Sequence, residues 1–154
     1  ALTNQGHKRA SVVKKLMNYI YRLPERFQFL PKVVYFWQIM QDMDKAMQTM
    51  EIHLDLFPQD IAGLTIHAQL LQSQGKYEEM VETYKTMLEI DPTHYNHLLS
   101  IGSIYTHYIK DTDKAMVYFN QYLEHFPDIW DPIFNFNENS LDFLMWSLIT
   151  ESSC

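Results

Sequence analysis

Apolar side chains recur at intervals of four residues ahead of four prolines. The prolines follow one another at spacings of 34, 34 and 35 residues and are Pro24, Pro58, Pro92 and Pro127. The apolar residues eight and four positions before them are Leu16 and Ile20, Met50 and Leu54, Tyr84 and Leu88, and Phe119 and Leu123. Residues four and eight apart lie on one face of an α-helix, and proline interrupts a helix because it lacks the backbone N–H. The pattern predicts four amphipathic helices, each ending near a proline.

A further helix fits between successive prolines. Val34, Ala68 and Gly102 hold equivalent positions in the three periods, and the small residues Ala68 and Gly102 stand where we expect two helices to approach closely. Residues 42–47 (DMDKAM) also recur as residues 111–116 (DTDKAM), so the periods are related in sequence as well as in length. We place the extra residue of the third period in the turn near Lys110, and we expect the first of these helices to begin at Pro31.

This organisation resembles the tetratricopeptide repeat, a family of two-helix repeats of about 34 residues that end in a proline. The clearest match runs from Leu64 to Pro92 and includes residues 75–77 (GKY). Two histidines depart from it: His67 stands where a leucine or a similar residue is typical, and His53 stands at a position where helices pack together. The resemblance implies an all-α fold, a right-handed superhelical solenoid of antiparallel helix pairs with a C-terminal capping helix.

The expected domain boundaries follow from this register. Residues 8–24 are expected to form a half repeat that consists of a second helix only. Three full repeats are expected over residues 27–127, with the bounds 27–58, 61–92 and 95–127. We expect residues 128–154 to form an aromatic linker and a capping helix, because a solenoid needs a cover over its last apolar face.

In the resembled family, the first helix of each pair lines a concave groove that binds an extended peptide or a helix. The corresponding residues here are Tyr35, Gln38, Thr65, Ile66, Gln69, Gln72, Asn96, Leu99, Ser103 and His107. One subtype of the family grips acidic C-termini with lysine and arginine side chains, which are not found at the corresponding places of this chain. An equally open interpretation is that these residues form only a solvated surface, because concave residues in repeats are exposed whether or not they bind.

Charge is unevenly distributed along the chain. Residues 1–32 carry seven Lys or Arg and one Glu, a net charge of +6, whereas residues 33–154 carry five Lys or Arg and eighteen Asp or Glu, a net charge of −13. We therefore expect a neutral or basic protein partner more than an acidic one. We do not expect nucleic-acid or membrane contact by the basic helix at residues 8–23, because its proline register matches a packed repeat helix. A third possibility is that this basic end meets an acidic end of another copy.

The C-terminal segment allows three interpretations. Capping of the repeats is the one we favour. The segment could instead mediate self-association, through its large apolar residues Phe143, Trp146 and Ile149. It could also occupy the groove of its own chain.

Motifs for chemistry are absent from the sequence: it has no Gly-rich phosphate loop, no pair of cysteines and no HExxH motif. His94 and His97 could approach one metal ion together with Asp91, but no fourth ligand is evident, and such residues at a helix entrance commonly form turn hydrogen bonds. We expect no enzyme, no cofactor and no bound metal. The single cysteine, Cys154, is compatible with a reducing compartment, and we expect a cytoplasmic protein.

Two interpretations of function follow. The first is a protein–protein interaction scaffold that binds a peptide or helix in the concave groove. The alternative is a regulatory or oligomerisation segment of a larger multidomain protein, such as a sensor, an enzyme or a transcription regulator. The start at Ala1 instead of Met favours the alternative somewhat.

Overall fold

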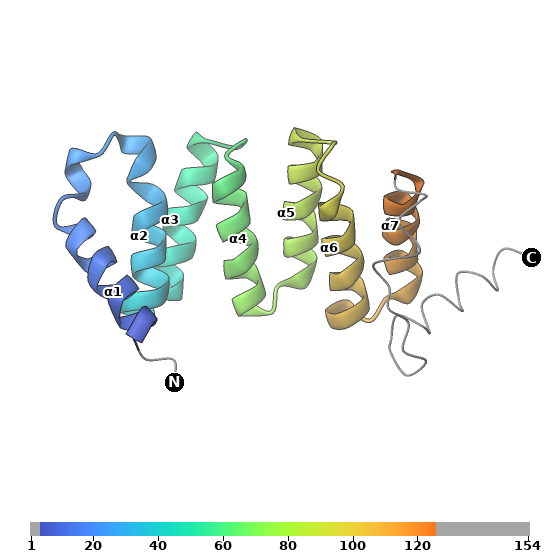
Figure 1. Cartoon of the computed structure of the whole chain (residues 1–154), viewed down its shortest axis with the longest axis horizontal. Helices are drawn as coiled ribbons and strands as arrows, with labels where there is room; N and C mark the ends of the chain where they lie inside the picture. Colours follow the sequence, from blue (N-terminus) through green and yellow to red (C-terminus); the bar gives the residue numbers. More distant parts are fainter. Residues whose placement is uncertain (1–3, 126–154) are drawn as a thin grey trace, which may run out of the picture. The chain divides into compact units, whose positions relative to one another are not determined.

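The computed structural model describes residues 4–125 of the chain, and all of the regular structure in this range is helical (Figure 1). The described part falls into two compact units, one that ends at Ile90 and one that begins at Asp91. The expected linker, the capping helix and the residues Phe143, Trp146 and Ile149 lie outside the described residues. No helix within the described range is long and apolar enough to cross a membrane.

The first unit contains five α-helices and three shorter helical segments. The α-helices are α1 (Asn4–Met17), α2 (Phe29–Val34), α3 (Met43–Leu56), α4 (Ile61–Gln74) and α5 (Tyr77–Ile90). The shorter segments are the 3₁₀ turns η1 (Ile20–Arg22) and η2 (Glu25–Phe27) and the π-helix η3 (Tyr35–Met40). Consecutive helices pack on one another, α2 on α3, α3 on α4 and α4 on α5, while α1 contacts α2 and η3. The expected all-α, repeat-like packing of neighbouring helices is confirmed for this unit.

Buried apolar side chains form a continuous core between these helices. Those with almost no exposed surface are Val33, Ala46, Met50, Ala68, Leu70, Leu71, Val81 and Met87. They come from every helix of the unit between α2 and α5, as expected for repeats that bury their apolar faces against their neighbours. The helix ends agree with the proline markers, because α3 ends at Leu56, two residues before Pro58, and α5 ends at Ile90, two residues before Pro92.

The first helices of the repeats end in two different ways. α4 ends at Gly75, whose φ of 72° is left-handed, and Lys76 N–H donates to the carbonyl of Leu71, five residues back. η3 ends at Gln41, also left-handed (φ 55°), but Asp42 N–H donates to the carbonyl of Phe36, six residues back. The π-helix therefore takes up one more residue than the end of α4 does.

This difference shifts the register of the first repeat by one residue. Val33 is fully buried, whereas Val34 is only half-buried. Val33 therefore takes the place that Ala68 holds in α4, and the expected equivalence of Val34 with Ala68 is wrong. The physical reason is the additional residue in η3, which cannot be recognised from a count of residues between prolines.

The N-terminal segment also departs from expectation. An uninterrupted helix over residues 8–23 is not formed, because α1 ends at Met17 and the chain turns before η1. From Asn18 onward the backbone N–H groups bond three residues back, which tightens the helix end, and asparagine has a low helix propensity. Val12 is 64% exposed and does not join the core, whereas Ile20 is buried. α2 begins at Phe29, so that Pro31 lies within its first turn and does not start it.

The second unit is a single helix pair. α6 (Asn96–Ile104) continues into the π-helix η4 (Tyr105–Ile109) and packs against α7 (Thr112–His125). The core of the pair is formed by Leu98, Ile101, Gly102, Ile104 and Ala115. The extra residue of the third period lies within η4 and not in the turn after it, because Asp111 N–H bonds to the carbonyl of Tyr105, six residues back.

Candidate functional site

The first and second helices of the pairs differ sharply in charge. α4, α6, η3 and η4 contain no Asp, Glu, Lys or Arg, and α2 contains one lysine, Lys32. The second helices are charged, since α3, α5 and α7 all begin with acidic residues and carry further acids and lysines along their length. The first helices therefore offer surfaces whose burial against a partner desolvates no charge.

On α4 the expected binding residues lie on the exposed side of the helix. Thr65, Gln69 and Gln72 are exposed and follow one another at helical spacing, and Ile66 beside them is half-buried. The Thr65 hydroxyl donates to the carbonyl of Ile61 at 2.7 Å, so its proton is used within the helix. The face combines amides that can donate and accept hydrogen bonds with one apolar side chain.

The first repeat contributes less of the expected surface. Gln38 is exposed, but Tyr35 is half-buried and its ring lies 5.8 Å from the ring of Phe36 in an edge-to-face arrangement. Because of the one-residue shift in η3, Tyr35 takes the position equivalent to that of Leu70 in α4. Leu70 is fully buried, which agrees with the partial burial of Tyr35. Gln38 is therefore the more accessible of the two expected residues.

In the second unit the expected residues occupy α6 and η4. Asn96 and His107 are exposed, while Leu99 and Ser103 are half-buried. His107 Nδ1 donates to the carbonyl of Ser103 at 2.9 Å, since a carbonyl oxygen can only accept. This bond orients the imidazole along the helix and leaves its Nε2 available to accept a hydrogen bond.

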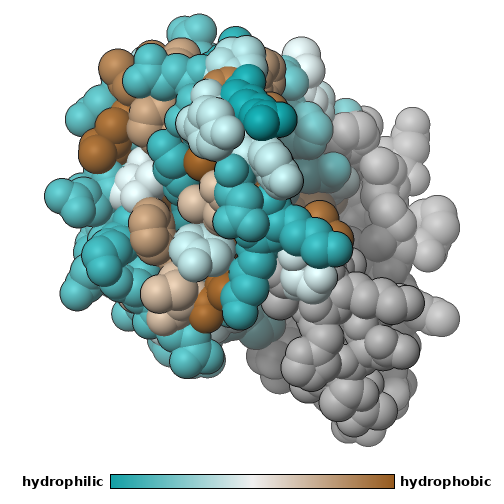
Figure 2. Space-filling view, turned by 90° about the vertical axis from the view of Figure 1, so that its left-hand side faces the viewer, coloured by the Kyte–Doolittle hydropathy of each residue, from teal (hydrophilic) through white to brown (hydrophobic). Residues whose placement is uncertain are grey.

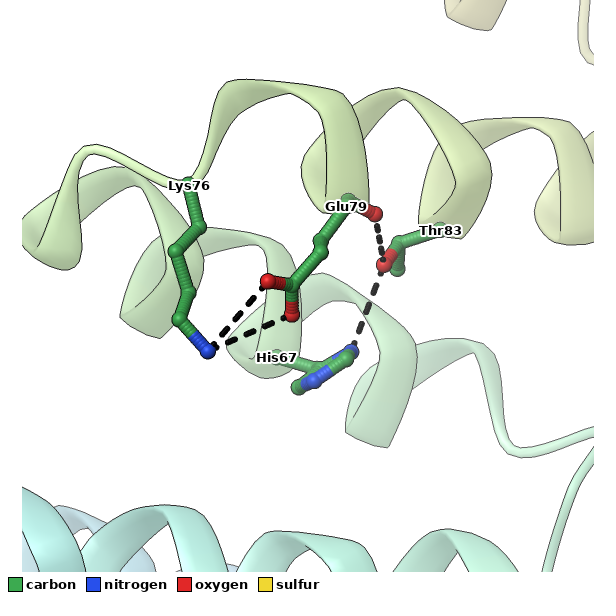
Figure 3. Close-up of polar contacts among 4 residues, drawn as sticks. All are labelled: His67, Lys76, Glu79 and Thr83. Carbon is green, nitrogen blue, oxygen red and sulfur yellow. Dashed lines mark hydrogen bonds and ion pairs between the residues drawn. The ribbon is translucent and has the colours of Figure 1, made fainter.

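A polar network between α4 and α5 was not foreseen from the sequence (Figure 3). His67 Nδ1 lies 3.3 Å from the hydroxyl of Thr83, which itself donates to the carbonyl of Glu79 at 3.0 Å. Lys76 pairs with the Glu79 carboxylate at 3.3 Å. Burial lowers the pKa of His67, although the carboxylates of Glu79 and Glu51 act in the opposite direction. His67 and Thr83 are sixteen residues apart in the sequence, so no local sequence pattern pairs them.

His53 forms a second polar contact, which is closed to ligands. Its side chain is fully buried, and its Nε2 lies 2.7 Å from Asp60 Oδ2 at the start of α4. The rings of Phe29 and Phe57 pack against it at 5.5 and 5.3 Å. A Cβ at Gly63 would come within 2.8 Å of the imidazole, so the glycine allows α4 to approach α3 at this point. We regard His53 as a packing residue that links two helices.

The histidines at the start of the second unit are held in a turn. The His94 and His97 rings stack at 4.8 Å, and Asp91 Oδ2 is 3.8 Å from His94 Nδ1. Thr93 donates its N–H and its hydroxyl to Asp91 Oδ1, and these bonds lower the pKa of Asp91. Burial and the neighbouring His94 lower the pKa of His97. Over residues 4–125 no three His, Cys, Asp or Glu side chains are grouped so as to hold a metal ion.

Comparison with known proteins gives matches over both units. Family profiles described as tetratricopeptide repeat match residues 63–94, which contain most of α4 and all of α5, and residues 98–128, which contain most of α6 and all of α7. The chain is also 27% identical over 103 residues to tetratricopeptide repeat protein 8 of Caenorhabditis elegans. This alignment covers 67% of the present chain but only 20% of that relative. The packed helix pairs, the spacing of their end markers and these matches together identify residues 63–94 and 98–128 as tetratricopeptide repeats.

Proposed function

We propose that this chain is a protein–protein interaction module that binds a peptide or a helix through the exposed, uncharged faces of its first helices. Tetratricopeptide repeats generally mediate contacts between proteins. The observation that carries the proposal is the absence of charged residues from α4, α6, η3 and η4 in a chain of net charge −7.

The chemistry of these faces supports a peptide ligand. Exposed Gln69 and Asn96 can each donate and accept hydrogen bonds to a peptide backbone, and half-buried Ile66 and Leu99 supply apolar contact. The surrounding acidic residues favour a neutral or basic peptide through long-range attraction. An acidic peptide would be repelled by the same field.

A binding selection tests the proposal. Peptides of random sequence are displayed on phage, selected on the immobilised chain and synthesised, and their affinities are measured by fluorescence anisotropy. Because a neutral hydrogen bond contributes about 1 kcal/mol, Gln69→Ala combined with Asn96→Ala is expected to weaken binding about five- to ten-fold or more. Glu89→Ala on the second helix α5 is the matched control and should leave the affinity nearly unchanged.

Equal affinities of the wild type and the Gln69→Ala, Asn96→Ala variant would overturn the assigned surface. A loss of affinity in the Glu89→Ala control alone would show that the peptide binds to the charged second helices instead. Circular dichroism of each variant checks that the helices are intact, which is expected because both substituted side chains are exposed.

A second candidate function is a regulatory or oligomerisation segment within a larger protein. This function is favoured by the comparison with tetratricopeptide repeat protein 8, because the alignment covers only 20% of that longer relative. In that setting the same uncharged faces would bind another segment of the larger protein. Selected peptides that resemble flanking sequence of the parent protein would distinguish this case.

A further inference from the structure

The 3₁₀ turns after α1 expose an unusual set of side chains. Tyr19, Tyr21 and Phe27 are 54%, 68% and 60% exposed, and Arg22 and Arg26 lie exposed between them. We call these five residues the basic aromatic surface. Figure 2 looks onto the side of the first unit that carries α1 and shows a largely hydrophilic face with separate hydrophobic patches.

Contacts within the unit hold this surface in shape. The Arg22 guanidinium lies 5.0 Å from the Tyr19 ring and 5.7 Å from the Tyr21 ring, and that of Arg26 lies 5.6 Å from the Phe57 ring. The side-chain amide of Gln28 donates to the carbonyl of Leu23 at 2.8 Å and ties the two turns together. A partner would therefore meet side chains that are already ordered, which reduces the entropy lost on binding.

The arginines of this surface differ from the lysines of the repeats. Lys45, Lys76, Lys85 and Lys114 each form an ion pair with a carboxylate three residues away. Among the ion pairs formed within residues 11–125, none involves Arg22 or Arg26. Each guanidinium can therefore pair with a carboxylate from outside, although Glu25 lies between the two arginines in the sequence and reduces the net charge of the segment.

A complementary surface exists on the same chain. The exposed face of α3 carries two parallel rows at a spacing of four residues, the acids Glu51 and Asp55 and the aliphatic residues Ile52 and Leu56. Ile52 is 47% exposed and Leu56 is 54% exposed, which is high for large aliphatic side chains. We call these four residues the acidic aliphatic face.

We propose that the basic aromatic surface of one copy of the chain docks on the acidic aliphatic face of a second copy. Arginine and tyrosine are enriched at protein interfaces, where they combine apolar contact with hydrogen bonding. The arginines would pair with Glu51 and Asp55, and the aromatic rings would cover Ile52 and Leu56. The net charges of +6 on residues 1–32 and −13 on residues 33–154 support such attraction between copies, and the −13 on residues 33–154 disfavours nucleic acid and anionic membranes.

A charge exchange tests the pairing. The wild type is expected to associate as concentration rises through the micromolar to millimolar range in sedimentation equilibrium. The association should weaken between about 0.05 and 0.5 M salt, because salt screens exposed charges. Arg22→Glu with Arg26→Glu, and separately Glu51→Lys with Asp55→Lys, should each weaken self-association about ten-fold or more. Mixing the two variants should restore association between them, because each supplies the charges that the other has lost.

The controls keep the outcome specific. The control variant is Glu89→Lys with Glu124→Lys. It changes the net charge by the same amount as Glu51→Lys with Asp55→Lys but leaves both surfaces intact, so it should weaken self-association much less. A wild type that stays monomeric overturns the proposal, and so does a mixture of the two exchanged variants that fails to associate. Binding of a single-stranded oligonucleotide or of phosphatidylserine vesicles to a monomeric wild type, lost in Arg22→Glu with Arg26→Glu, would assign the surface to a different class of partner.

Discussion

The pair α4–α5 and the pair α6–η4–α7 follow one plan but differ in which of two equivalent positions of the first helix is glycine. In the first pair the close-packing position is Ala68 and the left-handed end is Gly75. In the second pair the close-packing position is Gly102 and the left-handed end is Lys110, with φ 64°. Glycine solves a steric problem in both pairs, but a different one in each. The comparison separates the cost of side-chain crowding from the cost of backbone strain.

The two pairs also differ at the position before the close contact. The first pair has His67 there, which is half-buried and bonded to Thr83, and the second has Ile101, which is fully buried. The second pair is therefore apolar where the first is polar and able to take up a proton. This difference should appear in the pH dependence of stability.

The largest effect is expected from crowding in the second pair. A Cβ at Gly102 would lie 2.6 Å from Cε1 of Phe119, so Gly102→Ala forces the ring or the helix to move. Overpacking costs about 1–3 kcal/mol, and the better helix propensity of alanine returns about 1 kcal/mol. We expect a net loss of about 1 kcal/mol or more in the free energy of unfolding, measured by urea denaturation.

Two further variants sharpen this test. Ala68→Gly in the first pair should cost about 1 kcal/mol through propensity and lost packing, without any clash. Phe119→Leu should reduce the additional cost of Gly102→Ala, because it removes the ring that the new methyl group meets. If Gly102→Ala stabilises the protein, the close approach of α7 at this point is wrong.

A smaller effect is expected at the left-handed helix ends. Gly75→Ala should destabilise the protein by about 1 kcal/mol, because an L side chain is strained at positive φ. Lys110→Gly should stabilise it by about 0.5 kcal/mol, since relief of that strain is partly offset by the greater freedom of glycine in the unfolded chain. Thermal unfolding of both variants provides the measurement. A stabilised Gly75→Ala variant would contradict the left-handed assignment.

The smallest effect is expected from protonation of His67. Its folded-state pKa lies below the ordinary value of 6.5 because of burial, so the unfolded chain binds the proton more readily. The stabilising contribution of the neutral imidazole is complete above the unfolded pKa and falls as the pH drops through it. The urea midpoint should therefore decrease between about pH 7.5 and about pH 5.5.

His67→Leu isolates this contribution, because leucine gives the first pair an apolar residue where the second has Ile101. The variant should lose less stability on acidification than the wild type. Some pH dependence should remain, since the pKa of His97 is also lowered. An identical pH dependence in wild type and variant would show that His67 is not responsible for it.

The sequence predicted much of this architecture because the determinants of helix ends are local. A proline lacks the N–H that a helix needs, and it acts on its own neighbours, so α3 and α5 end where Pro58 and Pro92 indicate. The same holds for Asp42 and Asp111, whose carboxylates accept from the backbone N–H of residues three positions later. The expected binding residues Thr65, Gln69 and Gln72 of α4 are exposed because helical periodicity alone places them on one face.

Packing between helices decided the remainder. The π-helices η3 and η4 each hold an additional residue, and the choice of Val33 over Val34 for the core depends on how α2 meets α3. The contact of His67 with Thr83 joins residues on different helices, and the exposure of Val12 depends on which neighbours α1 has. Local spacing determines where a helix begins and ends, whereas the partner of a side chain is set by residues that only the folded chain brings near it.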